Sequence, residues 1–362
     1  MPKTLPQPDL NAGIEPDGRA IRREVARYRA PDPIRSLAQS SITIGGYLCA
    51  CAAMFVLVEY SYWLALALAP LAAGLLVRVF IVQHDCGHGS YFASKHLNDA
   101  LGLACSLLTL APYASWRRQH DGHHTVWNNL DRRDSGADIY SSCLTVDEYR
   151  STGAWPRFWY RACRHPLVAN LAIPPLIFLV LYRLPFDMPA NWRRERLAVY
   201  LTDLMLVPII GGLGWALGFG RLAEVQLPVI VIASIIGVWL FSIQHRSAST
   251  IWTQDRDWDS ARAALHGATY LRLPPILQWF TGNIGFHHIH HLNPKVPNYR
   301  LQECHEGVGA LSRVPALSFR DGLKAPLFTL WDEQRKCMTT FRAAASRHHS
   351  SSNPPINRRA FP

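Results

Sequence analysis

The sequence lacks three features that would assign it to common classes of protein. Its eight cysteines include no Cys-x-x-Cys pair, so we expect reduced thiols on a cytoplasmic face and no structural disulfide. Its first residues do not show the charged, apolar and small-residue order of a cleaved signal peptide. No internal repeat is evident either. Hydrophobic patterning is therefore the guide to the architecture.

Charged residues are nearly absent from several long windows, which is typical of a multi-pass membrane protein. The apolar windows are 41–58, 62–80, 101–114, 167–182, 197–219 and 225–243. A membrane span needs roughly 20 apolar residues. The first two windows, separated by Glu59–Ser61, and the last two, joined by a turn at 220–224, are expected to form two helical hairpins. The two middle windows are too short or interrupted by prolines, so we expect them at the membrane interface or re-entering it.

The net charge of +11 is concentrated in arginine-rich stretches such as 18–29 and 191–196, which flank apolar windows. Such flanks favour cytoplasmic anchoring on an anionic membrane over nucleic-acid binding. If both stretches are cytoplasmic, an even number of spans separates them, which predicts an all-α polytopic protein with four transmembrane helices in two hairpins and a cytoplasmic helical cap. Residues 1–40 are expected to form a polar segment, 41–331 the membrane domain, and 332–362 a tail that is disordered at its end.

Nine of the 16 histidines have spacings that suit metal ligands, close to the predicted ends of spans. One pair at i, i+4 and two copies of His-x-x-His-His place imidazoles on one helix face, where they can reach the same ion. One further histidine ends the fourth predicted span, where a capping role would explain it equally well. The candidate ligands are His84, His88, His120, His123, His124, His245, His287, His290 and His291.

Nine imidazoles are too many for one zinc ion, which takes three or four protein ligands. The box at His84 also lacks the glutamate of a His-Glu-x-x-His zinc protease. Nine neutral nitrogens can instead hold two divalent ions, although imidazole alone does not select the metal. Iron is favoured because redox chemistry on an inert substrate in a membrane needs oxygen activation, which zinc does not supply.

Two other classes of protein would also place histidines near a membrane. A metal transporter is one, but transporters put polar ligands at midplane inside broken spans, and the predicted spans contain no histidine. A zinc-dependent intramembrane hydrolase is the other. We expect metal analysis to distinguish both from an iron oxygenase.

Acidic and amide residues crowd the histidine boxes, and ligating imidazoles commonly donate their second N–H to such groups. We expect this supporting role for Asp85, Asp121 and Asn283. His288 lies about 100° around the helix from His287, so it supports the site or is spare. The remaining histidines, which lack ligand spacing or fall in the tail, are His96, His165, His266, His305, His348 and His349.

Three blocks of the sequence resemble the integral-membrane fatty acid desaturase family, in its acyl-lipid, omega-6 type branch. They are HDCGHGSYF (84–92), HDGHH with NLDRRDSGADIY (120–124 and 129–140), and LQWFTGNIGFHHIHHLNPKVPNYRL (277–301). The resemblance implies that the nine histidines bind two non-haem iron ions. It also implies O2-dependent formation of a cis double bond in an acyl chain of a membrane lipid. From the positive-inside topology we expect an inner or plasma membrane protein with the metal site on the cytoplasmic side.

The resemblance further implies an external electron donor, a ferredoxin or a b-type cytochrome, because no HPGG haem signature and no GxGxxG fingerprint is present. Arginines at 117, 118, 193 and 194 would suit an acidic donor, although membrane anchoring explains these charges equally well. Two departures leave the substrate open: no acid follows His245 in RSASTIW, and the second box is HDGHH. A hydroxylase, a triple-bond former, or a desaturase of a specialised amphiphile could share every ligand.

Overall fold

The first helical hairpin consists of α2 (Pro33–Val58) and α3 (Tyr62–His88) in a computed structural model that describes residues 18–133 and 140–346. Asp32 caps α2 by accepting hydrogen bonds from the backbone N–H groups of Ile34 and Arg35. The first span therefore begins before residue 41, inside the segment that the sequence suggested was polar. Ser61 caps α3, so the break between the two helices falls at Glu59–Ser61 as predicted.

The second hairpin consists of α9 (Arg193–Leu217) and α10 (Phe219–His245), and its turn differs from the prediction. The chain reverses at Gly218, whose φ of 88° is a conformation that glycine adopts without steric cost. Residues 220–224, which were expected to form the turn, are helical in α10. Leu222 in this segment is buried. The leucine, alanine and glutamate of the segment are good helix formers.

Four helices in the described residues are long and apolar enough to cross a membrane: α2, α3, α9 and α10. This agrees with the predicted four-span, two-hairpin architecture. A fifth span arises only if α7 (Ala154–Cys163) and the helical segment Val168–Arg183, bent by 56°, count as one. That segment contains η2 (Val168–Ala172), α8 (Ile173–Leu179) and η3 (Leu181–Arg183). The other short apolar window became α4 (Lys95–Thr109), which has 15 residues.

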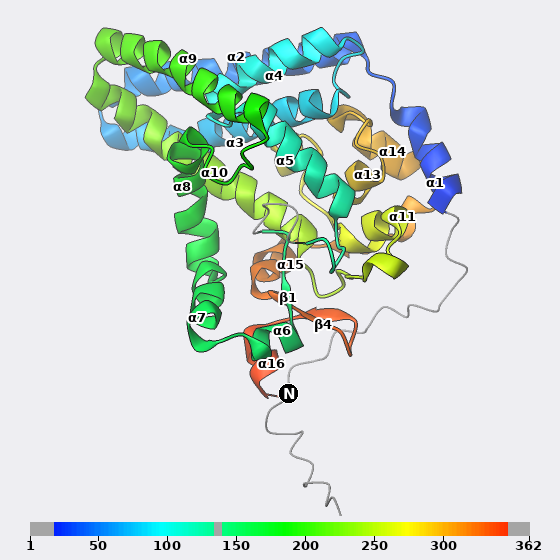
Figure 1. The fold of residues 1–362 in the computed structure, drawn as a ribbon. Coiled ribbons are helices and arrows are strands. Elements are labelled where there is room, and N and C mark those ends of the chain that lie inside the picture. The colour runs from blue at the N-terminus through cyan, green and yellow to red at the C-terminus, as the bar shows by residue number, and fades with distance from the viewer. Residues whose placement is uncertain (1–17, 134–139, 347–362) are drawn as a thin grey trace, which may run out of the picture.

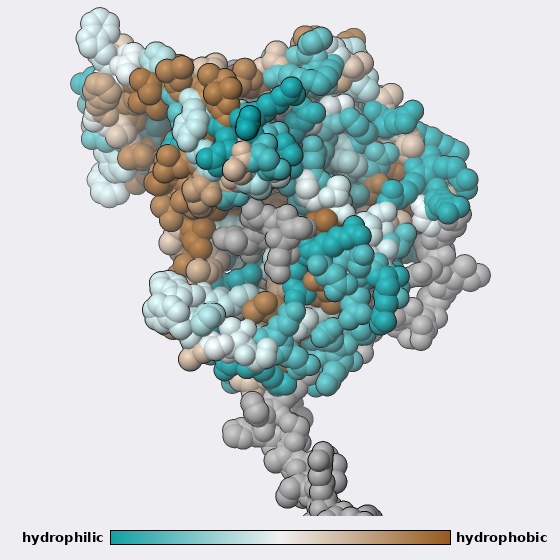
Figure 2. Space-filling view, in the orientation of Figure 1, coloured by the Kyte–Doolittle hydropathy of each residue, from teal (hydrophilic) through white to brown (hydrophobic). Residues whose placement is uncertain are grey.

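The remaining helices form a cap at one end of the four-helix bundle (Figure 1). In chain order they are α1 (Gly18–Val25), α5 (Tyr113–Val126), α6 (Val146–Ser151), α11 (Ser260–Arg262), α12 (Pro275–Phe280), α13 (His287–Leu292), α14 (Leu301–Gly307), α15 (Phe319–Lys324) and α16 (Phe341–Ser346). Figure 2 shows hydrophobic residues over α8 and α9 and mainly hydrophilic residues on the side of α1 and α11. The part of the surface that suits lipid is thus separate from much of the cap.

The mostly helical fold also contains two small sheets that periodicity did not predict. β1 (Leu144–Thr145) pairs in parallel with β4 (Leu330–Asp332), which pairs antiparallel with β5 (Cys337–Thr339). β2 (Tyr270–Leu271) pairs in parallel with β3 (Ala316–Leu317). Strands of two or three residues are too short to show an alternating pattern.

The sheet that contains β4 extends the fold beyond the predicted end of the membrane domain. β4 crosses the boundary between residues 331 and 332, and the side chain of Trp331 is buried. Residues 332–346 therefore continue the same fold. Residues 347–362, for which we predict disorder, lie outside the described residues.

Two hydrophobic clusters hold the site between them. The larger cluster joins α2, α3, α4 and α10, and it fixes the ends of α3 and α10. The smaller cluster joins α1, α11, α13 and α14 within the cap. The metal-ligand candidates lie where these two clusters meet, because α3 and α10 end at histidines and α13 consists largely of them.

Candidate metal centre

Two of the ligand candidates lie on the last turn of α3. His84 and His88 are four residues apart, so their rings share one helix face with centroids 4.8 Å apart. Gly89 ends the helix in the left-handed conformation, and its backbone N–H bonds to the carbonyl groups of Asp85 and Cys86. Both rings are buried.

The other candidates come from three further helices. α5 carries His120, His123 and His124, and α13 carries His287, His290 and His291. Both helices therefore present the predicted i, i+3, i+4 arrangement. His245 is the last residue of α10 and is 0% exposed.

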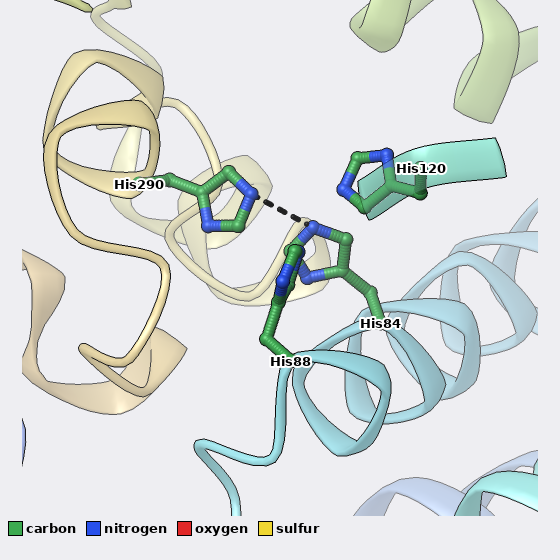
Figure 3. A group of neighbouring side chains, drawn as sticks. All are labelled: His84, His88, His120 and His290. Atoms are coloured by element: carbon green, nitrogen blue, oxygen red, sulfur yellow. Dashed lines mark hydrogen bonds between the residues drawn. The ribbon is translucent and has the colours of Figure 1, made fainter. Parts of the chain in front are cut away.

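The first group of rings consists of His84, His88, His120 and His290, whose ligand nitrogens all lie within 4.8 Å of one another. Figure 3 shows these four side chains pointing toward one another, with the Nε2 atoms of His84 and His290 3.1 Å apart. The Nε2 atom of His124 joins the group, at 3.2 Å from that of His120 and 3.0 Å from that of His290.

The second group contains His123, His245 and His291, whose ligand nitrogens also lie within 4.8 Å of one another. The Nε2 atoms of His123 and His245 are 3.1 Å apart. His287 joins them, because its Nε2 atom is 3.0 Å from those of both His245 and His291. The structure thus brings all nine predicted histidines together and divides them between two neighbouring groups.

The donor set suits divalent transition metals. Burial lowers the pKa of five of the candidate imidazoles on α5 and α13 below the ordinary histidine value, so these rings are neutral and can ligate. They are His120, His124, His287, His290 and His291. The buried Nε2 atom of His88 has no hydrogen-bond partner in the described residues. Such an atom is costly to bury unless a ligand satisfies it, and a metal ion in the first group would do so.

Asp85 is the clearest of the expected supporting residues. One carboxylate oxygen lies 3.0 Å from His84 Nδ1. The other accepts hydrogen bonds from the backbone N–H of Asn298 at 2.7 Å and from its side-chain amide at 2.8 Å. The carboxylate therefore fixes the His84 ring with Nε2 facing the group.

The three other expected supporting residues differ in position. Asp121 Oδ1 is 3.8 Å from His88 Nδ1, and partial burial raises the pKa of this carboxyl. Asn283 is not in contact with any described histidine through a hydrogen bond; it donates to the Asn298 carbonyl at 3.1 Å and so supports the same loop as Asp85. His288 is fully buried with its ring near those of Tyr270 and His305, and burial lowers its pKa to about 3.

Several residues at the site were not predicted. Asn298 lies within the third quoted block, but its spacing gave no sign of its contact with Asp85. Ser141 Oγ lies 3.4 Å from His123 Nδ1. Trp116 stacks on His120 with centroids 4.8 Å apart, and the Trp127 ring lies 3.9 Å from that of His245. The only sequence signal for the tryptophans was their proximity to the second box.

An apolar cavity of about 400 Å³ leads to the histidines. Its walls come from α3, α8 and α10, and include Leu76, Val77, Phe80, Ile81, Ile173, Ile177, Phe178, Ile230, Ala233, Gly237 and Phe241. The first histidine group contributes His84 and His120 to the lining, and the second contributes His123 and His287. Along α10 the lining runs from Ile230 to Gln244, which corresponds to about 21 Å of helix. The cavity suits a long, unbranched apolar chain.

Comparison with known proteins identifies the family. The family model described as "Fatty acid desaturase" matches residues 61–320. A fatty acid desaturase of Bacillus subtilis is 38% identical over 335 residues, which cover 92% of this chain and 93% of that protein. An sn-1 acyl-lipid omega-3 desaturase (ferredoxin) of Synechocystis is 26% identical, with 77% of this chain and 76% of that protein covered.

A plant relative agrees with the branch that the sequence resembles. The omega-6 fatty acid desaturase, endoplasmic reticulum isozyme 2, of Glycine max is 25% identical, with 73% of this chain and 70% of that protein covered. The family model spans more than half of the chain, and the Bacillus relative is similar over nearly all of it. The protein is therefore an enzyme of the fatty acid desaturase family, an oxidoreductase of the membrane.

Proposed function

We propose that the protein introduces a cis double bond into a fatty acyl chain of a membrane lipid, using O2 and two iron ions held by the nine histidines. The observation that carries this proposal is the apolar cavity that ends at both histidine groups. The lining is mainly aliphatic and aromatic, and Asp187 is its one carboxylate among the described residues, so an acyl chain can reach potential redox metals along an apolar wall. Transport of metal is less well supported, because the histidines lie at helix ends rather than at midplane.

Each of the two histidine groups would hold one metal ion. His84, His88, His120, His124 and His290 would bind one ion, and His123, His245, His287 and His291 the other. An iron pair bound there would supply the activation of O2 and the oxidation of an unactivated C–H bond, for which no side chain in the cavity is suited.

The chain's own residues bind, orient and exclude water. The aliphatic and aromatic walls of α3, α8 and α10 hold the acyl chain by apolar burial. A neutral imidazole has one unprotonated ring nitrogen that can bind a metal. Asp85 fixes the orientation of His84. In each turnover two hydrogens leave the acyl chain and two electrons arrive from a donor; with two solvent protons they reduce one O2 to two water molecules.

We place the histidine groups on the cytoplasmic side of the inner or plasma membrane, because the arginine-rich flanks of α2 and α9 lie at the same end of the bundle as the cap (Figure 1). The electron donor is a separate protein, a ferredoxin or a b-type cytochrome. The name of the Synechocystis relative includes a ferredoxin, which supports the first of these for a similar enzyme.

The test is expression in a host of known lipid composition, followed by gas chromatography of its fatty acids. A new unsaturated species is expected, whereas a hydroxylated product would instead identify a hydroxylase on the same scaffold. His290→Ala should abolish the product while folded protein accumulates normally. No new species from the wild-type chain, with iron and a donor supplied, would contradict the proposal.

A further inference from the structure

We propose that a small acidic electron-carrier protein docks on a basic surface formed by α1 and the turn that follows it. This inference rests on the proposed redox function, because only an enzyme that consumes electrons needs such a partner. The α1 surface is defined by Arg22, Arg23, Arg27 and Arg29. It differs from the arginines at 117, 118, 193 and 194, which the sequence suggested for this role.

The α1 surface carries a net positive charge, since its four arginines outnumber the one exposed acid of the same segment, Glu24. Arg23, Arg27 and Arg29 are exposed, and none forms an ion pair with an acid in the described residues. By contrast, Arg117 pairs with Asp99 at 3.1 Å, and Arg118 pairs with Glu195 at 2.8 Å. Those two arginines therefore retain less charge for a partner.

The two other arginines first suggested, Arg193 and Arg194, begin the transmembrane helix α9. Positive residues at the end of a span are the usual anchors on an anionic membrane. Their position thus has an explanation that needs no protein partner. The arginines of α1 are set back from the nearest span, because seven residues separate Val25 from the start of α2 at Pro33.

α1 packs against α11 and belongs to the same hydrophobic cluster as α13, the helix that carries three of the metal-ligand candidates. Ile21 is 3% exposed and Val25 is 0% exposed, and both belong to the hydrophobic cluster that contains Phe286, Ile289 and Leu292. Arg22 also donates a hydrogen bond to Ser260 Oγ at 2.7 Å. A partner on the α1 surface would therefore dock on the side of the cap that shares a hydrophobic core with α13.

Packed rings connect this side of the cap with α13. His288 is fully buried next to His287, and its ring lies 5.4 Å from that of His305 and 5.8 Å from that of Tyr270. The rings of Tyr270 and His305 are 4.7 Å apart, and His305 is partly exposed on α14. An electron that enters at His305 would pass through the packed rings of Tyr270 and His288 toward α13. His288 would then be part of the electron path.

The position of α1 favours a protein partner over the membrane surface. α1 lies at the far end of the cap from the α9–α10 turn (Figure 1), and hydrophilic residues dominate its side of the molecule (Figure 2). The hydrophobic residues gather over α8 and α9 instead. An acidic carrier would be attracted by the exposed arginines, and this attraction would weaken as salt increases.

The experiment compares two charge-reversed double variants of the full-length enzyme in neutral detergent. One is Arg23→Glu with Arg27→Glu. The matched control, Arg320→Glu with Arg335→Glu, makes the same change of charge at two other exposed arginines. Each variant is supplied with electrons either from a reduced acidic [2Fe–2S] ferredoxin or from dithionite, and desaturated product is measured at low and high salt.

We expect the α1 variant to lose about tenfold or more in kcat/KM for ferredoxin at low salt, with a smaller loss at high salt. Its dithionite-driven activity and all activities of the control should equal those of the wild type. An unchanged kcat/KM, an equal loss in the control, or an equal loss with dithionite would overturn the docking site. Reduced binding to anionic vesicles with unchanged ferredoxin kinetics would also overturn it, in favour of a membrane contact. Failure of the proposed function is distinct, because the wild type would then form no product with either donor.

Discussion

The two histidine groups use the same ligand atoms but differ in what lies behind them. The first is supported by carboxylates: Asp85 contacts His84, and Asp121 lies near His88. In the second group, the Nδ1 atoms of His245 and His287 are buried without a hydrogen-bond partner in the described residues, and in the first group only that of His124 is. A carboxylate behind an imidazole raises its basicity and fixes its orientation. We therefore expect the first group to bind its metal more tightly.

The largest expected effect comes from removing one ligand of the second group. His245→Ala should abolish activity and lower the iron content from roughly two ions per chain to roughly one, since the first group keeps all its ligands. Elemental analysis of the purified protein measures this. His96→Ala, which alters an exposed histidine outside both groups, should keep full activity and iron. If His245→Ala retained the full iron content, His245 would not be a ligand.

A smaller effect is expected from Asp85→Asn, which removes the carboxylate behind the first group. The amide would face His84 with an N–H group where the ring now has an acceptor, so both activity and iron affinity should fall by about 10- to 100-fold. Turnover and iron titration of the purified variant are the measurements. Wild-type values for both would show that Asp85 only supports the loop at Asn298.

Both groups border the cavity, so a change in its wall tests whether the acyl chain lies against them. A side chain at Gly237 would extend from α10 into the cavity, since an added Cβ meets no atom within 4 Å. Gly237→Leu should reduce turnover several-fold and shift the products toward shorter chains, as measured by gas chromatography. Gly220→Leu is the matched control, because it also meets no atom within 4 Å but does not line the cavity. Equal product profiles would exclude this cavity as the acyl site.

The smallest effect is expected from Ser141→Ala, the counterpart of Asp85→Asn in the second group. The contact between Ser141 Oγ and His123 Nδ1 is long, at 3.4 Å, and a neutral hydrogen bond is worth only about 1 kcal/mol. Turnover should therefore fall by less than about tenfold. A loss as large as that of Asp85→Asn would remove the proposed difference between the groups.

The sequence was sufficient to predict the two hairpins and eight of the nine histidines that cluster, because both follow from periodicity along single helices. His245 was predicted instead from its position at the end of the fourth span. Apolar windows of span length became α2, α3, α9 and α10. Histidines spaced by three and four residues must share a helix face. The position of a helix and the residues that share one of its faces were therefore predictable.

The failures concern features that depend on contacts between distant segments or on a single backbone conformation. Asn298 reaches Asp85 across 213 residues of sequence, and no local pattern signals such a contact. Asn283 was expected to contact the histidines because it is an amide residue near them in the sequence. It hydrogen-bonds to the Asn298 carbonyl instead. The hairpin turn was placed at 220–224, whereas the positive φ of Gly218 sets it.

The metal content of the purified, active protein tests the central claim most directly. Two buried groups of imidazoles at the end of one apolar cavity predict roughly two iron ions per chain, lost together with desaturase activity on chelation and restored with it on adding ferrous iron. One zinc ion per chain with no iron, in protein that is fully active, would contradict the account.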